Sequence, residues 1–256
     1  MTKIFIKLEN IPMTDTQTKT STTPITYTKP NINLIEIEVK VLLWEESNAT
    51  NLIEKLLAHT DTKKTWWSNQ LNHYFLANGN FQDLKSKLQE YIHADHHHKL
   101  EDILINWKKH SIRTRDADGK VLFVIKATKD DTSSENGTAR LEFEHETPGL
   151  TIHELDQLIL DNGFEYQSKW SRNRKDFSYK DFNVSIDKNA WYGYVAEFEK
   201  IISDSNDIDQ AKESIRNELN SLWIEELAQD RLERMFKYYN ENRPEYYGTD
   251  KTFIIL

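Results

Sequence analysis

Charged and apolar residues alternate strictly along the segment NLIEIEVKVLL, which begins at residue 33. Glu36, Glu38 and Lys40 occupy one set of alternate positions, and isoleucine and valine occupy the other. Successive side chains of a β-strand point to opposite faces, so this pattern predicts a strand with one apolar and one charged face. Three later segments repeat the pattern with Arg113/Arg115, with Arg140/Glu142/Glu144, and with Glu197/Glu199.

Turn residues and apolar spacing predict the remaining elements. Further strands are expected over residues 70–76, 110–116, 120–129, 139–146, 164–177, 182–187 and 192–200. The pairs Asp118-Gly119 and Asn136-Gly137 are typical of hairpin turns. Helical spacing predicts helices over 49–59, within 81–100, from the capping-box pair Thr151/Glu154 to about Gly163, and as one long stretch over 207–239.

Composition and charge limit the domain organisation, the binding partners and the location that are expected for this chain. The Thr-rich residues 1–30 are expected to be an extended leader, and residues 31–256 a single domain. A net charge of −9 disfavours attachment to extended nucleic acid or to an anionic membrane, and the absence of cysteine excludes disulfides and thiolate chemistry. No stretch is as apolar as a signal peptide or a spanning helix, so a cytoplasmic location is expected.

The charged strand faces have two interpretations. Each pattern alone also fits a sheet face exposed to water. However, pairs of glutamates on one face of three strands are unfavourable unless cations lie between them. Magnesium and manganese prefer carboxylate oxygens, and Arg and Lys suit phosphate. Carboxylates and bases lining one cavity would therefore bind a metal-bridged polyphosphate.

In these residues the chain resembles the CYTH family of triphosphate tunnel enzymes, which includes class IV adenylyl cyclases, thiamine triphosphatases and inorganic triphosphatases. The resemblance spans about residues 34–256. Its motifs, in order, are E-x-E-x-K at 36–40, Q-x-x-x-Y-F at 70–75, R-x-R at 113–115 with Lys126, R-x-E-x-E at 140–144, R-N-R with Phe177, Asp187 before E-x-E at 197–199, and K-T-F at 251–253. Three departures are Leu76, where the family usually has Asp, Arg172, where it more commonly has Lys, and a long insertion over 76–112.

The resemblance implies an α+β fold, an eight-stranded antiparallel β-barrel tunnel braced by α-helices, with bound Mg²⁺ or Mn²⁺. By matching position, the implied metal ligands are Glu36, Glu38, Glu142, Glu144, Asp187, Glu197 and Glu199. The implied phosphate-binding residues are Lys40, Arg113, Arg115, Lys126, Arg140, Arg172 and Arg174. The implied catalytic residues are Glu36, Glu38 and Lys40.

The expected activity is metal-dependent hydrolysis of inorganic triphosphate or a small organic triphosphate. The alternatives are a class IV adenylyl cyclase, which forms cAMP and pyrophosphate from ATP, and a non-catalytic nucleotide or polyphosphate binder. The histidines at 93 and 96–98 could bind a metal or form a solvated face, and tryptophans such as Trp170 could stack on a base or fill the core. The C-terminal helix fits either the outside of the barrel or a homodimer face.

Overall fold

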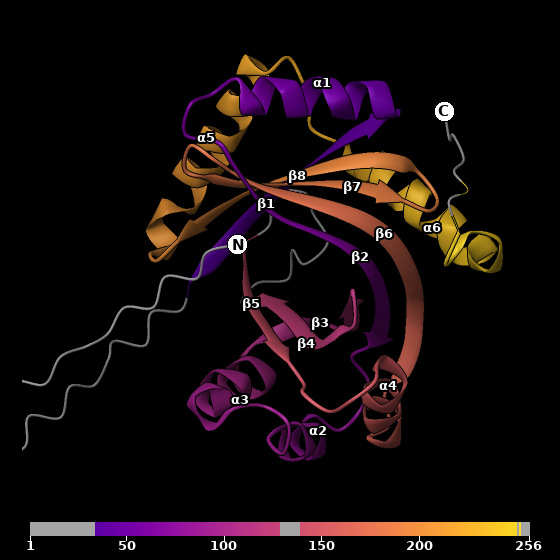
Figure 1. Cartoon of the computed structure of the whole chain (residues 1–256). Coiled ribbons are helices and arrows are strands. Elements are labelled where there is room, and N and C mark those ends of the chain that lie inside the picture. The colour runs from indigo at the N-terminus through magenta and orange to yellow at the C-terminus, as the bar shows by residue number, and fades with distance from the viewer. Residues whose placement is uncertain (1–33, 129–138, 250, 252–256) are drawn as a thin grey trace, which may run out of the picture. The chain divides into compact units, whose positions relative to one another are not determined.

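The computed structural model describes residues 34–128, 139–249 and 251, and Figure 1 shows its elements. The strands are β1 (Ile35–Trp44), β2 (Lys63–Leu76), β3 (Lys108–Ala117), β4 (Lys120–Thr128), β5 (Ala139–Glu146), β6 (Glu165–Tyr179), β7 (Phe182–Asn189) and β8 (Gly193–Ile202). The helices are α1 (Glu46–Leu57), α2 (Phe81–Leu88), α3 (His97–Asn106), α4 (Ile152–Asp161), α5 (Ile208–Ser221) and α6 (Gln229–Tyr246), with short 3₁₀ turns η1 (Ala94–His96) and η2 (Ser205–Asp207).

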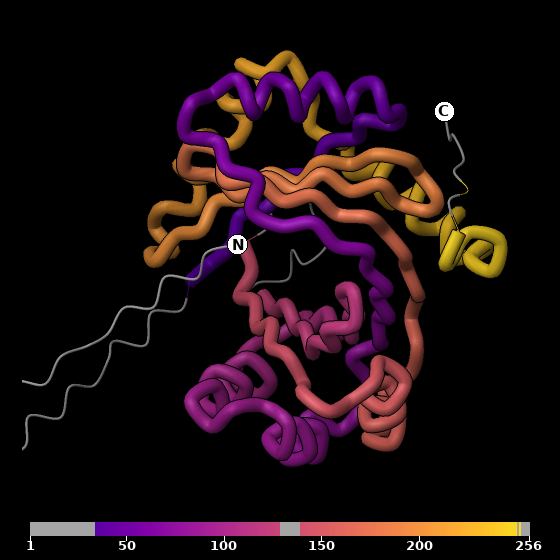
Figure 2. Tube along the Cα trace, in the orientation of Figure 1, coloured from indigo at the N-terminus to yellow at the C-terminus, as the bar shows by residue number. Residues whose placement is uncertain are grey.

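The eight strands form one antiparallel sheet that closes on itself in the order β1-β5-β4-β3-β2-β6-β7-β8. Closure depends on β1, which pairs with β5 on one side and with β8 on the other. The long strands β2 and β6 pair along almost their whole length and curve together along one wall of the ring (Figure 2). The predicted eight-stranded α+β tunnel is therefore confirmed.

The sheet places its apolar side chains outward, against the helices. Ile37, Val39 and Val41 of β1 are buried in a cluster with α1 and α5. A second cluster packs α2, α3 and α4 against β3, β4 and β5, around residues such as Phe143 and Leu155. Figure 1 shows these two helical layers on opposite outer sides of the ring, with α1 and α5 above it and α2, α3 and α4 below it. Because the helices cover the apolar faces, the alternate charged faces turn toward the interior.

A third cluster attaches α6 to the ring. Leu232, Met235 and Tyr239 of this helix pack on Trp191 and Tyr192, in the turn before β8. The hydroxyl of Tyr239 donates to the backbone carbonyl of Lys169 on β6. The C-terminal helix thus lies against β6 and the β7–β8 turn.

Most of the predicted elements are confirmed, and one is wrong. The stretch over 207–239 is two helices, because α5 ends at Ser221 and α6 begins only at Gln229. Trp223 has a φ of 58° between them, a left-handed conformation that no helix interior accommodates. Apolar spacing continues through the break because Leu222 and Leu227 are both buried there.

Hairpin and cap predictions are confirmed where the structure describes them. Gly119 has a φ of 87° in the β3–β4 turn, and Thr151 with Glu154 forms the capping box of α4. The Asn136-Gly137 turn, residues 1–30 and positions 252–253 lie outside the described residues. Within the described part of the chain, no helix is long and apolar enough to cross a membrane.

Candidate active site in the tunnel

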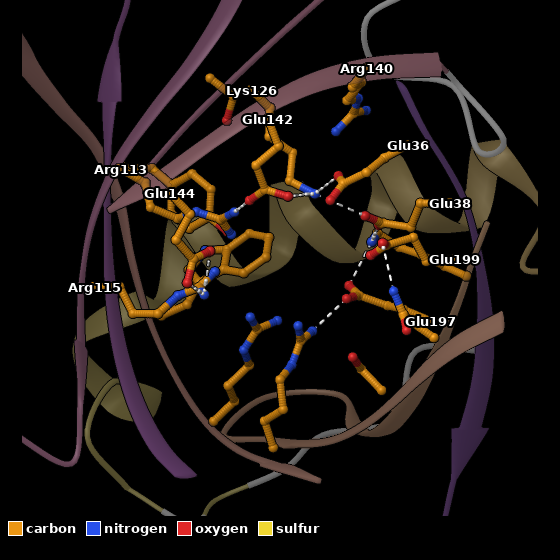
Figure 3. Close-up of a pocket in the computed structure, with 18 of the residues that line it drawn as sticks. Glu36, Glu38, Arg113, Arg115, Lys126, Arg140, Glu142, Glu144, Glu197 and Glu199 are labelled. Atoms are coloured by element: carbon orange, nitrogen blue, oxygen red, sulfur yellow. Dashed lines mark hydrogen bonds and ion pairs between the residues drawn. The ribbon is translucent and has the colours of Figure 1, made fainter. Parts of the chain in front are cut away.

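A cavity of about 610 Å³ lies inside the ring of strands. Of the fourteen residues predicted for the site, thirteen line it, and the exception is Asp187. They come from β1, β3, β4, β5, β6 and β8, so segments distant in sequence meet in one space. Figure 3 shows the labelled glutamates and arginines pointing inward from the surrounding strands.

Strand register brings the glutamates of β1 and β8 together. Glu38 lies opposite Glu199, and Lys40 lies opposite Glu197. The Lys40 ammonium donates to Glu197 Oε1 at 2.6 Å and also pairs with Glu38. On the other side of β1, Glu36 lies opposite Arg140 of β5. Two strand pairings therefore gather acidic residues from three strands.

The ammonium of Lys126 lies among carboxylates from two strands. Its Nζ is 2.7 Å from Glu36 Oε2, 3.3 Å from Glu38 Oε2 and 2.9 Å from Glu142 Oε2. Burial alone would lower the pKa of Lys126, but Glu142 and Glu36 outweigh burial and raise it well above its usual value. The single positive charge of Lys126 thus forms ion pairs with three carboxylates.

The single ammonium of Lys126 does not compensate the negative charge of all the glutamates around it. Burial raises the pKa of Glu36 well above its ordinary value, and the nearby Glu142 and Glu199 raise it further. Burial likewise raises the pKa of Glu199, with Glu142 and Glu38 adding to the effect. Glu38 differs because burial is outweighed there by Lys40, Lys126 and Arg140 together, which lower its pKa to about 2. The carboxylates of β1, β5 and β8 are here called the acidic cluster (Glu36, Glu38, Glu142, Glu197, Glu199). Repulsion acts on Glu36 and Glu199, whereas at Glu142 and Glu197 the neighbouring Lys and Arg side chains outweigh burial and lower the pKa.

Guanidinium groups crowd another part of the cavity. Arg115 donates through Nε to Asn72 at 3.0 Å and through Nη1 to both oxygens of Glu144 at 2.8 Å. Burial and the neighbouring Arg113 nevertheless lower the pKa of Arg115 to about 10, with Arg172 also contributing. These residues, with Arg174, are called the basic cluster (Arg113, Arg115, Arg172, Arg174). Because their positive charges repel one another, an anion bound among them would reduce that repulsion.

The two β6 arginines are held by Asp187 of β7. Arg174 lies opposite Asp187 in register, and Arg172 Nη1 also donates to Asp187 Oδ2 at 2.8 Å. Asp187 is only 1% exposed and does not line the cavity. Its predicted role as a metal ligand stays a prediction, whereas its contacts are those of a carboxylate that orients two guanidiniums.

The acidic cluster has the chemistry of a divalent-cation site. Its donors are carboxylate oxygens, which hard cations such as Mg²⁺ and Mn²⁺ prefer. Lys126 stands in for part of the cationic charge that these oxygens need. Among residues 34–128, 139–249 and 251, no three acidic or histidine side chains already converge on one metal-binding point. By donor type, Glu36, Glu142 and Glu199 are carboxylates that such a cation would accept as ligands.

The sequence did not single out several other side chains that line the cavity. Thr65, Asp176, Asn183 and Ser185 contribute from β2, β6 and β7, and Tyr192, Leu232, Phe236 and Asn240 contribute from the β7–β8 turn and α6. Tyr74 of the Q-x-x-x-Y-F motif and Trp170, which the sequence did single out, line the cavity as well. The alternation on β6 could have found Asp176, since it continues the inward set of Arg172 and Arg174. The α6 residues carry no such signal, because only the tertiary fold brings them to the cavity.

The histidine-rich segment lies away from the cavity. The ring of His96 packs on His145 of β5, with ring centroids 3.8 Å apart. Burial lowers the pKa of His145 to about 4, and the neighbouring His96 and Lys99 contribute. The described histidines form no group that could hold a metal ion. The insertion that carries them forms α2, η1 and α3, which pack outside β3–β5.

Solved structures share the fold at low sequence identity. The PH1012 protein of Pyrococcus horikoshii is 17% identical, with a TM-score of 0.53 over 74% of this chain and 91% of that one. The PH1819 protein of the same organism is 19% identical, with a TM-score of 0.51 over 76% and 93%. A Vibrio parahaemolyticus protein provisionally named an adenylate cyclase is 12% identical, with a TM-score of 0.50 over 76% and 93%.

Sequence comparisons give the family. A search of curated proteins finds no significant match to this chain. The family model of the CYTH domain matches residues 34–231, which include every strand of the ring and every cavity-lining residue except Leu232, Phe236 and Asn240 of α6. The chain therefore belongs to the CYTH domain family.

Proposed function

We propose that this protein hydrolyses a triphosphate inside the tunnel in a reaction that depends on Mg²⁺ or Mn²⁺. The observation that carries the proposal is that crowded carboxylates and crowded guanidiniums line one cavity. Carboxylates crowd on β1, β5 and β8, and guanidiniums crowd on β3 and β6. In Figure 3, Glu36, Glu38, Glu197 and Glu199 lie on one side and Arg113 and Arg115 on the other. A metal-bridged polyphosphate satisfies both groups together.

The charge balance of the cavity supports a metal-bound substrate. Apart from histidine, eight basic and seven acidic side chains line the cavity, so the wall is close to neutral. A triphosphate carries about four negative charges near neutral pH. The wall alone cannot neutralise that charge, whereas a divalent cation held by the acidic cluster would supply most of the difference.

The proposed roles follow from position. Arg113, Arg115, Arg172 and Arg174 grip phosphoryl oxygens through their planar donor groups. Lys40, Lys126 and Arg140 add charge at the border with the acidic cluster. Water attacks the terminal phosphorus, the bridging P–O bond breaks, and a carboxylate of the acidic cluster accepts the proton that the water loses. When bound to this cluster, the cation would stabilise charge on the phosphoryl oxygens.

A class IV adenylyl cyclase is the second candidate. The fold likeness to the Vibrio protein brings this activity into consideration, and the same charge arrangement would serve it. In that reaction the ribose 3′-oxygen attacks the α-phosphorus and pyrophosphate leaves. The two reactions differ in which phosphorus is attacked, and hence in their products.

Product analysis separates the candidates. Purified full-length protein is incubated with Mg²⁺ or Mn²⁺ and with tripolyphosphate, ATP or thiamine triphosphate, and orthophosphate, pyrophosphate and cAMP are measured separately. The proposal expects orthophosphate release that ceases on chelation. Equal amounts of pyrophosphate and cAMP from ATP would replace it with the cyclase, and tight binding without any product would leave a non-catalytic binder.

A further inference from the structure

A buried carboxylate joins several strands on the outer face of the sheet. Asp156 of α4 is 1% exposed, and its Oδ1 accepts a hydrogen bond from the hydroxyl of Thr114 at 2.6 Å. Its Oδ2 lies 2.6 Å from Nδ1 of His73 and 2.6 Å from the hydroxyl of Tyr166. His73 and Thr114 are also almost completely buried. Side chains from β2, β3 and β6 therefore meet at one carboxylate of α4.

The carboxylate of Asp156 is ionised and accepts all three hydrogen bonds. Burial alone would raise its pKa, but hydrogen bonds from His73, Thr114 and Tyr166 outweigh burial and lower it. An ionised carboxylate can only accept, so Nδ1 of His73 carries the proton of its hydrogen bond. Hydrogen bonds to an ionised acceptor are stronger than those between neutral groups. The three residues that tie β2, β3 and α4 together in this way are called the outer clamp (His73, Thr114, Asp156).

The outer clamp lies directly behind two residues of the basic cluster. His73 and Thr114 face each other in register across β2 and β3. The residue pairs on either side of them contain Arg113 and Arg115, whose side chains line the cavity. Neighbouring residues of a strand point to opposite faces. The clamp therefore grips the outer face at the place where both arginines enter the cavity from the inner face.

Each of these arginines is oriented by a β2 side chain across the same strand pair. Arg115 Nε donates to Asn72 Oδ1 at 3.0 Å, and Arg113 Nη1 donates to the hydroxyl of Tyr74 at 2.9 Å. Both distances depend on the spacing of β2 and β3, because donor and acceptor stand on different strands. A carboxylate that fixes this spacing from the outer face also fixes the guanidiniums on the inner face. Packed and hydrogen-bonded support of this kind keeps a binding side chain in its productive geometry.

The outer clamp also reaches the C-terminal helix. The hydroxyl of Tyr247 lies 2.5 Å from Nε2 of His73, whose Nδ1 is bonded to Asp156. Tyr247 is the C-cap residue of α6, and its backbone N–H donates to the carbonyl of Arg243. Helix α6 forms part of the cavity wall through three of its side chains. One imidazole thus connects the clamp with the end of a helix that lines the cavity.

We propose that the outer clamp positions Arg113 and Arg115 for phosphate, and that Tyr247 couples the clamp to the end of α6. The proposal rests on the proposed function only in assigning phosphate binding to the two arginines. No member of the clamp lines the cavity, so its members are positioning residues that act through the spacing of β2 and β3. Loss of the clamp should therefore weaken phosphate binding more than it slows the reaction of bound substrate.

A matched pair of substitutions at one position tests the proposal. Thr114→Val removes the hydroxyl from the clamp at nearly constant volume, whereas Thr114→Ser keeps it. Affinity for tripolyphosphate is measured by calorimetry with Mg²⁺, and KM and kcat are measured where turnover occurs. We expect Thr114→Val to raise the dissociation constant and KM about fivefold with kcat within about twofold, and Thr114→Ser to restore wild-type values. Tyr247→Phe should raise the dissociation constant about threefold.

Tyr179→Phe controls for a merely structural effect. It removes a hydrogen bond of 2.7 Å from a buried tyrosine to Glu218 of α5, in the opposite helical layer. Both tyrosine variants should lower the midpoint of thermal unfolding. Only Tyr247→Phe should weaken tripolyphosphate binding, because Tyr179 has no connection to the strand pair that carries the two arginines.

A spectroscopic measurement tests the clamp without any substrate. The Nε–H group of Arg115 exchanges its proton with water slowly while it donates to Asn72, and NMR follows that exchange. Thr114→Val and Asp156→Asn should speed the exchange at least about tenfold, and Tyr179→Phe should not. An exchange rate in Thr114→Val equal to that of wild type would overturn the proposal. Faster exchange in this variant, with no tripolyphosphate binding by wild type, would overturn the proposed function instead and leave the positioning role standing.

Discussion

Arg174 and Asp187 face each other in register across β6 and β7 and form a two-pronged ion pair. Arg174 Nε donates to Asp187 Oδ1, and Arg174 Nη2 donates to Asp187 Oδ2, each at 2.7 Å. Burial alone would lower the pKa of Arg174, but Asp187 and Glu197 raise it well above its ordinary value. The pair fixes the plane of a guanidinium at the cavity wall before any ligand arrives.

Asp187→Asn should therefore weaken substrate binding and stability together. Two buried guanidiniums lose their shared anion, and breaking a buried pair of this kind costs about 3 kcal/mol of unfolding free energy. We expect KM for triphosphate to rise about tenfold, because Arg172 and Arg174 are no longer held in place. Urea unfolding and steady-state kinetics measure the two effects.

Tripolyphosphate should stabilise Asp187→Asn less than it stabilises the wild type. Stabilisation by a ligand follows its affinity for the folded protein, so the weaker binding expected of this variant should make its midpoint of thermal unfolding rise less on ligand addition. Asp181→Asn, on the exposed β6–β7 turn, is the control and should behave as wild type. An equal ligand-induced rise in both variants would show that Asp187 does not orient the arginines.

Glu36→Gln should abolish metal-dependent turnover without unfolding the protein. The substitution removes one carboxylate from a cluster in which like charges already oppose ionisation, so the stability of the metal-free protein should not fall. We expect a loss of at least about 100-fold in kcat. Phosphate release and thermal unfolding are measured beside Glu54→Gln, an exposed change on α1, and near-normal turnover would remove Glu36 from the site.

Lys126→Met should make folding depend on divalent cations. The variant leaves Glu36, Glu38 and Glu142 without the ammonium that lies within 3.3 Å of each, and uncompensated buried charge costs about 3–5 kcal/mol. Adding Mg²⁺ or Mn²⁺ should restore most of this loss, as followed by thermal unfolding with a chelator as reference. Lys237→Met, on the exposed face of α6, controls for the loss of a lysine. If the metal raises the midpoint no more than in wild type, the acidic cluster is not the cation site.

His145 should make stability depend on pH between about 6.5 and 4. Its pKa falls to about 4 in the folded protein because of burial and of His96, whereas the unfolded chain protonates it near its ordinary value of 6.5. The unfolded state then binds more protons in this window, so stability present above pH 6.5 is lost as pH falls toward 4. His145→Gln should flatten this part of the pH profile of the urea midpoint. A profile identical to wild type would rule out His145 as the titrating group.

The sequence predicted the tunnel well because its signal is local. Charged side chains at every second position of β1, β3, β5 and β8 require only the geometry of a strand, and that geometry put ten predicted residues on the cavity wall. The family resemblance added Lys126 of β4 and Arg172 and Arg174 of β6. The closure of the sheet was predicted from the resemblance to the CYTH family, whose motifs occur in the same order. No single segment of the sequence indicates that closure.

The sequence could not predict what depends on tertiary contacts. The break at Trp223 is invisible to apolar spacing, because Leu222 and Leu227 on both sides remain buried. The approach of Phe236 to the cavity is equally hidden, since an apolar residue on an amphipathic helix looks the same whether it faces a core or a ligand. Asp187 was read by motif position, while its actual partners depend on the pairing of β6 with β7.

The closure of the ring through β1 has a consequence for synthesis on the ribosome. Ile35 pairs with Leu141 on one side and with Ile202 on the other, so β1, the earliest of the described strands, waits for partners from far along the chain. During that interval its free edge could join another nascent polypeptide, and the charges of Glu36, Glu38 and Lys40 discourage such pairing. The residues that the finished protein offers to its ligand would also guard the unfinished one against aggregation.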